Sequence, residues 1–195
     1  MRNIGAVILA AGGSTRLGQA KQLLTFRDET LISRVVRAAA EAGCDPIVVV
    51  AGEIGDGIRQ ELDSTGATVV ENAEWQRGLG TSIRRGVQEI SESADAVVLL
   101  TCDQVLVDRS VIAQLIATQK KTGKRIVASS YANTLGVPAL FGRSYFEALL
   151  ALPDDSGAKS LIEERPDDVA SIPFEDGAID IDTPEDFERL NEKCD

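Results

Sequence analysis

The chain has 195 residues, a formal net charge of −11 and no histidine. This length suits one domain whose core needs neither disulfides nor a structural metal, so we expect a single domain over residues 1–195. Three widely spaced cysteines without any histidine speak against a disulfide framework and against a Cys/His zinc site. A bound metal would then be a hard cation held by carboxylates.

The charge is unevenly distributed along the chain. Residues 1–152 carry 16 acidic and 16 basic side chains, whereas residues 153–195 carry 15 acidic and 4 basic ones. Such an acidic chain is a poor candidate for binding polymeric nucleic acid or an anionic membrane, because both need a basic surface. The apolar run Ile4–Ala11 is too short to span a bilayer and lacks a signal-peptide pattern. We therefore expect a cytoplasmic enzyme with no nucleic-acid or membrane partner. A small anionic ligand is still compatible with such a chain where a few basic residues and backbone amides converge, or where a divalent cation bridges the ligand and carboxylates.

Apolar runs and helical patterns alternate along the first two thirds of the chain. The apolar runs are continuous, which is typical of strands covered on both faces. Their alternation with helices predicts an α/β fold with a doubly wound, mainly parallel sheet. The predicted strands are Ile4–Ala11, Pro46–Ala51, Ala67–Glu71, Ala94–Thr101 and Arg125–Ser130, and the predicted helices are Thr30–Ala42, Gly55–Leu62, Thr81–Ile90 and Ser110–Lys121.

Thr81 and Asp108 stand where helix N-caps belong. In an open α/β sheet, ligands bind beyond the carboxyl ends of the strands, so the loops after Ala11, Thr101 and Ile181 are predicted to carry the chemistry. The second half of the chain is less regular. Its predicted elements are strand Leu135–Phe141, helix Arg143–Leu150, helix Ser156–Glu164, strands Val169–Ile172 and Ala178–Ile181, and a terminal helix from Pro184.

A glycine-rich loop with two cations follows the first predicted strand. It reads Leu9-Ala10-Ala11-Gly12-Gly13-Ser14-Thr15-Arg16-Leu17-Gly18-Gln19-Ala20-Lys21. Glycines allow main-chain N–H groups to point at phosphate oxygens, and Arg16 and Lys21 would neutralise the phosphate charge. The spacing matches neither the Walker loop nor the Gly-x-Gly-x-x-Gly dinucleotide motif. On these residues alone, an ordinary turn with two solvated basic side chains is an equal alternative.

The loop resembles the signature of the sugar-nucleotidyltransferase-like superfamily and of its MobA-like NTP transferases, which include the molybdenum-cofactor guanylyl- and cytidylyltransferases. The continuation Lys21-Gln22-Leu23-Leu24 is most similar to the cytidylyltransferase branch. The resemblance implies a three-layer α/β/α Rossmann-like nucleotidyltransferase fold with a mainly parallel central sheet. It implies that Arg16 and Lys21 are catalytic. It also implies a triphosphate-binding set of Leu9, Ala10, Ala11, Gly12, Gly13, Ser14 and Lys21.

Two places in the sequence offer carboxylates for a cation. Asp103 follows the predicted strand Ala94–Thr101, where it would bind Mg²⁺ or, alternatively, cap the next turn. In the tail, Asp180 and Asp182 alternate along one strand face, so both could approach one cation. Asp182 or Thr183 could also cap the helix that begins at Pro184, and the two interpretations are compatible. By resemblance, Asp103 is a catalytic metal ligand, Asp182 the second metal carboxylate and Asp180 a supporting ligand.

The Asp103 element departs from the family pattern in two ways. Val105 replaces the proline of the family's Asp-Gln-Pro element, and Thr101-Cys102 stand where a glycine often precedes the aspartate. The metal role of Asp103 does not depend on either position, whereas the conformation of the loop does.

Three further stretches resemble substrate-binding elements of the family. Gly78-Leu79-Gly80-Thr81-Ser82-Ile83 stands at the place for the nucleobase, which implies nucleotide contacts from Gly80 and Ser82; a simple N-capped helix is the alternative. Gly136–Phe141 and Asp155–Lys159 resemble elements on the molybdopterin side. Lys159 replaces the usual arginine there, which keeps the charge but loses bidentate geometry.

These observations predict a Mg²⁺-dependent enzyme that transfers a nucleoside monophosphate, in the first instance CMP, from a nucleoside triphosphate to a small phosphorylated acceptor such as molybdopterin. A molybdoenzyme or its maturation chaperone would then be the partner. One alternative is a transferase of the same fold acting on a sugar phosphate or another small phosphorylated acceptor. Another is a non-catalytic module that binds a nucleotide or cofactor and delivers it; the carboxylates argue against this one, since a degenerate binder has no need of a metal pair.

Overall fold

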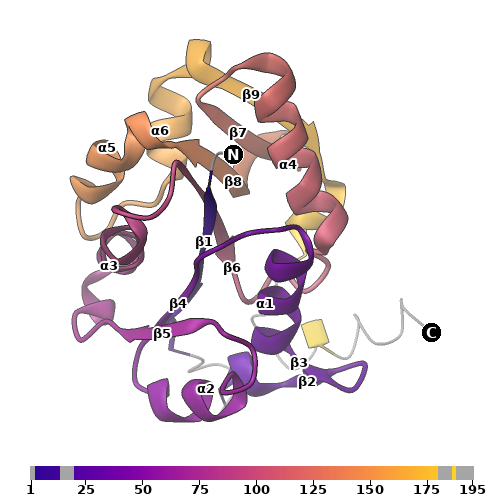
Figure 1. Cartoon of the computed structure of the whole chain (residues 1–195), viewed down its shortest axis with the longest axis vertical. Helices are drawn as coiled ribbons and strands as arrows, with labels where there is room; N and C mark the ends of the chain where they lie inside the picture. The colour runs from indigo at the N-terminus through magenta and orange to yellow at the C-terminus, as the bar shows by residue number, and fades with distance from the viewer. Residues whose placement is uncertain (1–2, 14–19, 180–185, 188–195) are drawn as a thin grey trace.

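The computed structural model describes residues 3–13, 20–179 and 186–187. A seven-stranded sheet forms its centre. Helices lie on both faces of this sheet (Figure 1). The strands run in the order β5-β4-β1-β6-β8-β7-β9. Their bounds are β1 Ile4–Ala10, β4 Ile47–Ala51, β5 Thr68–Glu71, β6 Ala96–Thr101, β7 Ile126–Tyr131, β8 Thr134–Gly142 and β9 Val169–Pro173.

The sheet is mainly parallel, as predicted. Parallel pairs join β5 to β4, β4 to β1, β1 to β6 and β7 to β9, whereas β8 runs antiparallel to both of its neighbours. The chain builds outward from β1 to β5 and then returns to place β6 on the other side of β1. Strand order therefore reverses beside β1, and ligands of doubly wound sheets bind at such a switch point.

Six α-helices among the described residues cover the two faces of the sheet. Apolar side chains of α1, α2 and α4 join the core on one face, and those of α3, α5 and α6 join it on the other. All residues of β1 and β4 are buried, which explains their continuous apolar sequences. The helices are α1 Leu31–Glu41, α2 Gly55–Glu61, α3 Leu79–Ile90, α4 Arg109–Thr122, α5 Phe146–Leu150 and α6 Lys159–Glu164.

Local sequence explains several element ends. The Asp108 carboxylate accepts hydrogen bonds from the backbone N–H groups of Ser110 and Val111, so the predicted N-cap of α4 is confirmed. Helix α3 begins earlier than predicted, at Leu79 after the N-cap Gly78, and Thr81 lies inside its first turn. The Thr81 hydroxyl donates to the Gly78 carbonyl instead of capping the helix.

Two hairpins add to the elements that the sequence predicts. Residues 132 and 133 alone connect β7 to β8, and both have positive φ, the conformation of a two-residue turn that matches strand twist. A smaller sheet pairs β2 Thr25–Phe26 with β3 Glu29–Thr30 through a turn of the same kind at residues 27 and 28.

The predictions for the last third need correction in three places. The predicted strand Ala178–Ile181 is wrong in its described part, because Glu175–Ala178 form the 3-10 helix η5 and Ile179 is not in a strand. Helix α6 begins at Lys159 rather than Ser156, and the predicted helix from Arg143 opens with the 3-10 turn η3 (Arg143–Tyr145). Within residues 3–13, 20–179 and 186–187, no helix is long and apolar enough to cross a membrane.

Candidate functional site

Two of the loops that the sequence singled out meet at one edge of the sheet. Leu9 of β1 is paired with Thr101 of β6, and Ala10 is paired with Ala51 of β4. The carboxyl ends of these parallel strands therefore lie side by side. The residues that follow β1 and β6, from Ala11 and from Cys102, are brought together although they are far apart in the sequence.

The described start of the glycine-rich loop is held by a buried glutamine. Ala11 is buried, whereas Gly12 and Gly13 are exposed beyond the end of β1. The side chain of Gln22 is 1% exposed, and its Nε2 donates to the carbonyl oxygens of Ala10 at 2.8 Å and of Gly12 at 2.9 Å. Leu9 and Ala10 are buried in the strand, so they support the loop from below. Ser14 and Arg16 lie outside the described residues.

Lys21 and Asp103 form an ion pair at this edge. Lys21 begins the short 3-10 helix η1 (Lys21–Leu23), and Asp103 follows β6. The Lys21 Nζ lies 2.9 Å from Asp103 Oδ2, with the two side chains 12% and 26% exposed. An ion pair that is partly shielded from water interacts more strongly than one on an open surface. The structure thus joins the predicted catalytic lysine to the predicted metal carboxylate.

Gln104 anchors the loop that carries Asp103. It is 5% exposed, and its Nε2 donates to the carbonyl oxygens of Val137 in β8 and of Gly177 in η5, each at 3.0 Å. The loop after β6 is thereby tied both to the antiparallel strand and to the segment that leads towards Asp180. This anchoring role of Gln104 is not recognisable from the sequence, because its partners lie far away in the chain.

The described residues supply one of the three predicted metal carboxylates. Within the described ranges, no group of three or more His, Cys, Asp or Glu residues could hold a metal ion. Asp180 and Asp182 lie outside these ranges. Ile179 and Phe187 stand on either side of them in the chain, and both pack against the small core cluster of Phe26, Leu31 and Val105.

The oxygen chemistry of Asp103 fits a hard divalent cation. Its carboxylate is partly exposed at the carboxyl edge, and carboxylate oxygens are the ligands that Mg²⁺ and Mn²⁺ prefer. One of its oxygens accepts from Lys21, so a cation would bind beside the ammonium group or displace it. The two flanking anchors, Ile179 and Phe187, lie near the same loop through Val105.

Gly80 and Ser82, expected to contact the nucleotide, are both buried in the first turn of α3. The Gly80 N–H donates to the Asp154 carbonyl at 2.9 Å, and the Ser82 hydroxyl accepts from the side chain of Asn72 at 3.0 Å. Asn72 follows β5, is 6% exposed, and also donates to the Thr81 hydroxyl at 2.8 Å. Ser82 thereby fixes the first turn of α3 to the end of β5, and Gly80 fixes it to the loop after α5.

The two stretches expected on the acceptor side take different positions. Gly136–Phe141 form most of β8, in which residues 138–141 are buried. Asp155–Ala158 form the loop that enters α6, and Lys159 is the first residue of that helix. The Lys159 side chain is about half exposed, and its Nζ lies 3.7 Å from Oε1 of Glu163. The first stretch therefore supports the site, whereas the second presents side chains at the surface.

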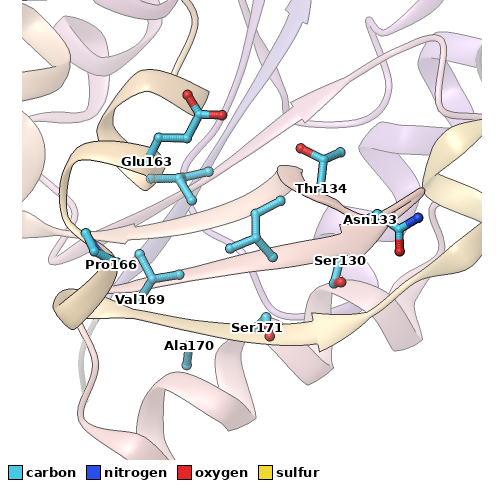
Figure 2. Close-up of a pocket in the computed structure, with 10 residues that line it drawn as sticks. Ser130, Asn133, Thr134, Glu163, Pro166, Val169, Ala170 and Ser171 are labelled. Carbon is cyan, nitrogen blue, oxygen red and sulfur yellow. The ribbon is translucent and has the colours of Figure 1, made fainter.

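A cavity of about 610 Å³ lies between α6 and the β7–β8 hairpin. Figure 2 shows Ser130, Asn133 and Thr134 at one end of it and Pro166 and Val169 at the other. Glu163 is the charged residue of its lining, so the cavity does not suit a phosphate group. It suits a neutral group of a ligand instead. The remaining lining residues are Leu135, Ile162, Ala170 and Ser171.

Cys102 lies next to Asp103 but is buried. Burial raises the pKa of the Cys102 thiol to about 12. A thiol that holds its proton at neutral pH is a poor nucleophile and a poor metal ligand. Cys102 is therefore a packing residue of this loop.

A doubly wound sheet whose carboxyl edge joins a glycine-rich loop, a lysine and an aspartate defines an α/β enzyme of the nucleotidyltransferase class. The chain belongs to the MobA-like NTP transferase family, whose domain model matches residues 6–169. Similar proteins include the nicotine blue oxidoreductase of Paenarthrobacter nicotinovorans, 24% identical over 96% of each chain. The purine catabolism protein PucB of Bacillus subtilis is 27% identical over 94% of each chain.

Several solved structures share the fold of this chain. Rv0371c from Mycobacterium tuberculosis H37Rv is 31% identical with a TM-score of 0.82, covering 98% of this chain and 99% of that one. The same protein has been crystallised in complex with manganese, and that structure matches at 30% identity and a TM-score of 0.78 over 97% and 98% of the two chains. A nucleotidyl transferase from Methanothermobacter, 22% identical, shares the fold with a TM-score of 0.83 over 98% and 97%.

Proposed function

We propose that this nucleotidyltransferase transfers CMP from CTP to the phosphate of molybdopterin and releases pyrophosphate. The observation that carries the proposal is the Lys21–Asp103 pair, which sets a cation and a carboxylate beside the glycine-rich loop at the switch point of the sheet. The choice of CTP rests on the resemblance of residues 21–24 to the cytidylyltransferase branch. The choice of acceptor rests on the resemblance of residues 136–141 and 155–159 to elements on the molybdopterin side.

The triphosphate is proposed to lie over the loop after β1. Exposed Gly12 and Gly13 can turn backbone N–H groups towards phosphate oxygens, and Gln22 holds the base of the loop in place. Leu9, Ala10 and Ala11 form the buried support of that loop. In this proposal Ser14 and Arg16 complete the phosphate site. Gly80 and Ser82 hold the helix turn against which the base lies.

Asp103, Asp182 and Asp180 are proposed to hold Mg²⁺. Asp103 has a partly exposed carboxylate, whose oxygens can bind the cation. Ile179 and Phe187 stand on either side of the tail carboxylates in the chain, and both pack near the Asp103 loop. When bound, a divalent cation would neutralise charge shared by the nucleotide and the acceptor phosphate. The manganese complex of Rv0371c supports a divalent cation in this family.

The proposed reaction needs positioning and charge stabilisation more than proton transfer. An oxygen of the acceptor phosphate attacks the α-phosphorus, the bond from that phosphorus to the bridging oxygen of the β-phosphate breaks, and pyrophosphate leaves with the electron pair. Lys21 and Arg16 stabilise the negative charge that develops on the phosphates. An acceptor phosphate that is already ionised carries no proton to remove, which agrees with a chain that contains no histidine.

The acceptor is proposed to approach from β8 and α6. Lys159 at the start of α6 offers a cation for its phosphate, and the cavity between α6 and the β7–β8 hairpin can take a neutral part of the molecule. We place the reaction in the cytoplasm, where nucleoside triphosphates are available. A molybdoenzyme or its maturation chaperone would receive the product.

The test is pyrophosphate release by the full chain with Mg²⁺, comparing CTP, GTP and ATP, each with molybdopterin and with sugar phosphates. CTP with molybdopterin should give the fastest release, together with a product whose mass equals that of molybdopterin plus CMP. Faster release with a sugar phosphate would overturn the acceptor, and faster release with GTP would overturn the base. Lys21→Met serves as the inactive reference protein.

A further inference from the structure

The loop of residues 152–157 lies across the first turn of α3. The Asp154 carbonyl accepts the hydrogen bond of the Gly80 N–H at 2.9 Å. The approach is so close that a Cβ atom on Gly80 would stand 1.9 Å from the Pro153 carbonyl oxygen. Glycine is therefore required at position 80 for the loop to lie where it does.

The side chain of Asp154 clamps this loop through two arginines. Its Oδ1 pairs with Arg84 of α3, and its Oδ2 pairs with Arg77 of the 3-10 helix η2 (Trp75–Arg77) that precedes α3. Arg84 also donates to the Leu152 carbonyl, so one guanidinium binds the loop at two points. Both Arg84 and Asp154 are less than one-third exposed. The hydrogen bond from Arg84 is the largest cause that lowers the pKa of Asp154.

The clamped turn is also tied to the sheet. Buried Asn72, at the carboxyl end of β5, donates to the hydroxyl groups of Thr81 and Ser82. A continuous set of polar contacts thus runs from the carboxyl edge through the first turn of α3 to Asp154. The next residue in the loop, Asp155, begins the stretch that the proposed function assigns to the acceptor side.

We infer that Asp154 is a positioning residue of the transferase, which fixes the acceptor-side loop on the helix turn that borders the nucleobase. This inference rests on the proposed function. Asp154 acts through Arg84 and Arg77 rather than by touching a substrate. Without the clamp, the wall of the nucleotide site loses its fixed position, and nucleotide binding weakens while the phosphate chemistry at Lys21 is unchanged.

The test compares CTP dissociation constants and the kinetic constants kcat and KM of the full chain in Mg²⁺. Asp154→Ala removes both ion pairs, and Gly80→Ala displaces the loop by adding one carbon atom. We expect both variants to raise the Kd and KM for CTP about tenfold, a typical coupling between two parts of a site, with kcat changed less than about twofold. Asp154→Glu should recover part of the affinity, because it can still pair with Arg84.

Arg85→Gln is the matched control. Arg85 lies on the same helix, but it forms an ion pair with Glu89 one turn further along α3, and both side chains are partly exposed. It should leave Kd and KM unchanged. Melting temperatures separate a positioning role from a general loss of stability. Asp154→Ala and Arg85→Gln each remove only partly exposed ion pairs. Both variants should therefore melt within a few degrees of the wild type.

The outcomes distinguish the two proposals. A wild-type protein that binds CTP, with Asp154→Ala and Gly80→Ala binding equally well, overturns the inference and leaves the proposed function standing. A loss of kcat without a rise in KM also overturns it, since Asp154 would then act on the chemical step. If the wild type binds no nucleotide, the proposed function fails and the inference falls with it.

Discussion

The Nζ of Lys21 lies 2.9 Å from Oδ2 of Asp103, although the two residues are 82 positions apart in the chain. Lys21 stands at the end of the glycine-rich loop that follows β1. Asp103 follows β6, which is paired with β1. Parallel pairing of β1 with β6 is what brings them together. The pair places opposite charges where a triphosphate and its cation would each need a counter-charge.

Lys21→Met tests the role of the cation while keeping a side chain of similar length. We expect kcat for pyrophosphate release to fall by about 100-fold or more, because one preorganised charge on the leaving phosphates is lost. The Kd for CTP should rise only a few-fold, since backbone amides still bind the triphosphate. Single-turnover release and calorimetric titration measure the two quantities.

Lys120→Met is the control for this experiment, because Lys120 lies on the exposed side of α4. It should leave both constants unchanged. Wild-type turnover in Lys21→Met would remove Lys21 from the proposed mechanism.

Gln104→Met tests the anchor of the Asp103 loop. The substitution leaves the carbonyl oxygens of Val137 and Gly177 without this donor, so we expect a loss of about 1–3 kcal/mol in the free energy of unfolding. The affinity for Mn²⁺, followed by its paramagnetic resonance signal in the absence of nucleotide, should fall as well because Asp103 is displaced.

Gln119→Met is the matched variant for this prediction. Gln119 is equally buried, at 6% exposure, but lies in α4. It should lower stability without changing Mn²⁺ affinity. Equal Mn²⁺ affinities in the two variants would show that Gln104 has only a structural role.

Much of the fold follows from the sequence because its signals are local. Continuous apolar runs mark β1 and β4, and the Asp108 cap marks the start of α4. Elements whose conformation depends on distant partners are harder to predict. Residues 175–178 carry no strong periodicity, and their 3-10 turn is fixed by the Gln104 contact to Gly177, 73 positions away. A short connection at residues 132 and 133 is the local sign that β8 turns back on β7.

The candidate site shows the same division. The glycine-rich loop, Lys21 and Asp103 are recognisable from the sequence, because each stands at a strand end or in a specific motif. The structural roles of Gln22, Asn72 and Asp154 are not, although Gln22 belongs to a recognised motif, since these roles appear only once the helix turns and loops have been packed together. Gln22 and Asn72 are polar residues that stand close to a recognised motif in the sequence, and this position is the signal that could have marked them.

Gly86→Ala tests how closely α3 packs on the sheet. A Cβ atom at this position would stand 2.3 Å from Cγ1 of Val7 in β1, so the helix has to shift. We expect a destabilisation of about 1–3 kcal/mol, which outweighs the gain of up to ~1 kcal/mol from the better helix propensity of alanine. Urea unfolding followed by circular dichroism measures it. A more stable variant would contradict the packing described for α3.

The cysteines give a prediction about pH. Burial raises the pKa of Cys44 and of Cys102 to about 12. The native state therefore keeps protons that the unfolded chain releases above its ordinary thiol pKa of about 8.5. Stability contributed by these neutral thiols is fully present below that pH and is lost as the pH rises towards about 12. Unfolding free energies measured from about pH 8 to about pH 10.5 should fall accordingly.

Thiol labelling checks the same burial directly. In a Cys194→Ser background, a thiol reagent at about pH 8 should leave the native protein unlabelled and modify both remaining cysteines after unfolding. Rapid labelling of Cys102 in the native protein would show that the loop beside Asp103 is open to solvent.

Nucleotide binding to the loop after β1 is the central claim, and a thermal-shift panel tests it most directly. CTP, GTP, ATP and UTP are each added to the wild type and to Lys21→Met, with and without Mg²⁺. A ligand that binds only the folded state raises the melting temperature in proportion to its binding free energy. We predict the largest rise for CTP, dependent on Mg²⁺ and smaller in the variant; no rise with any of the four nucleotides would contradict the phosphate-loop assignment.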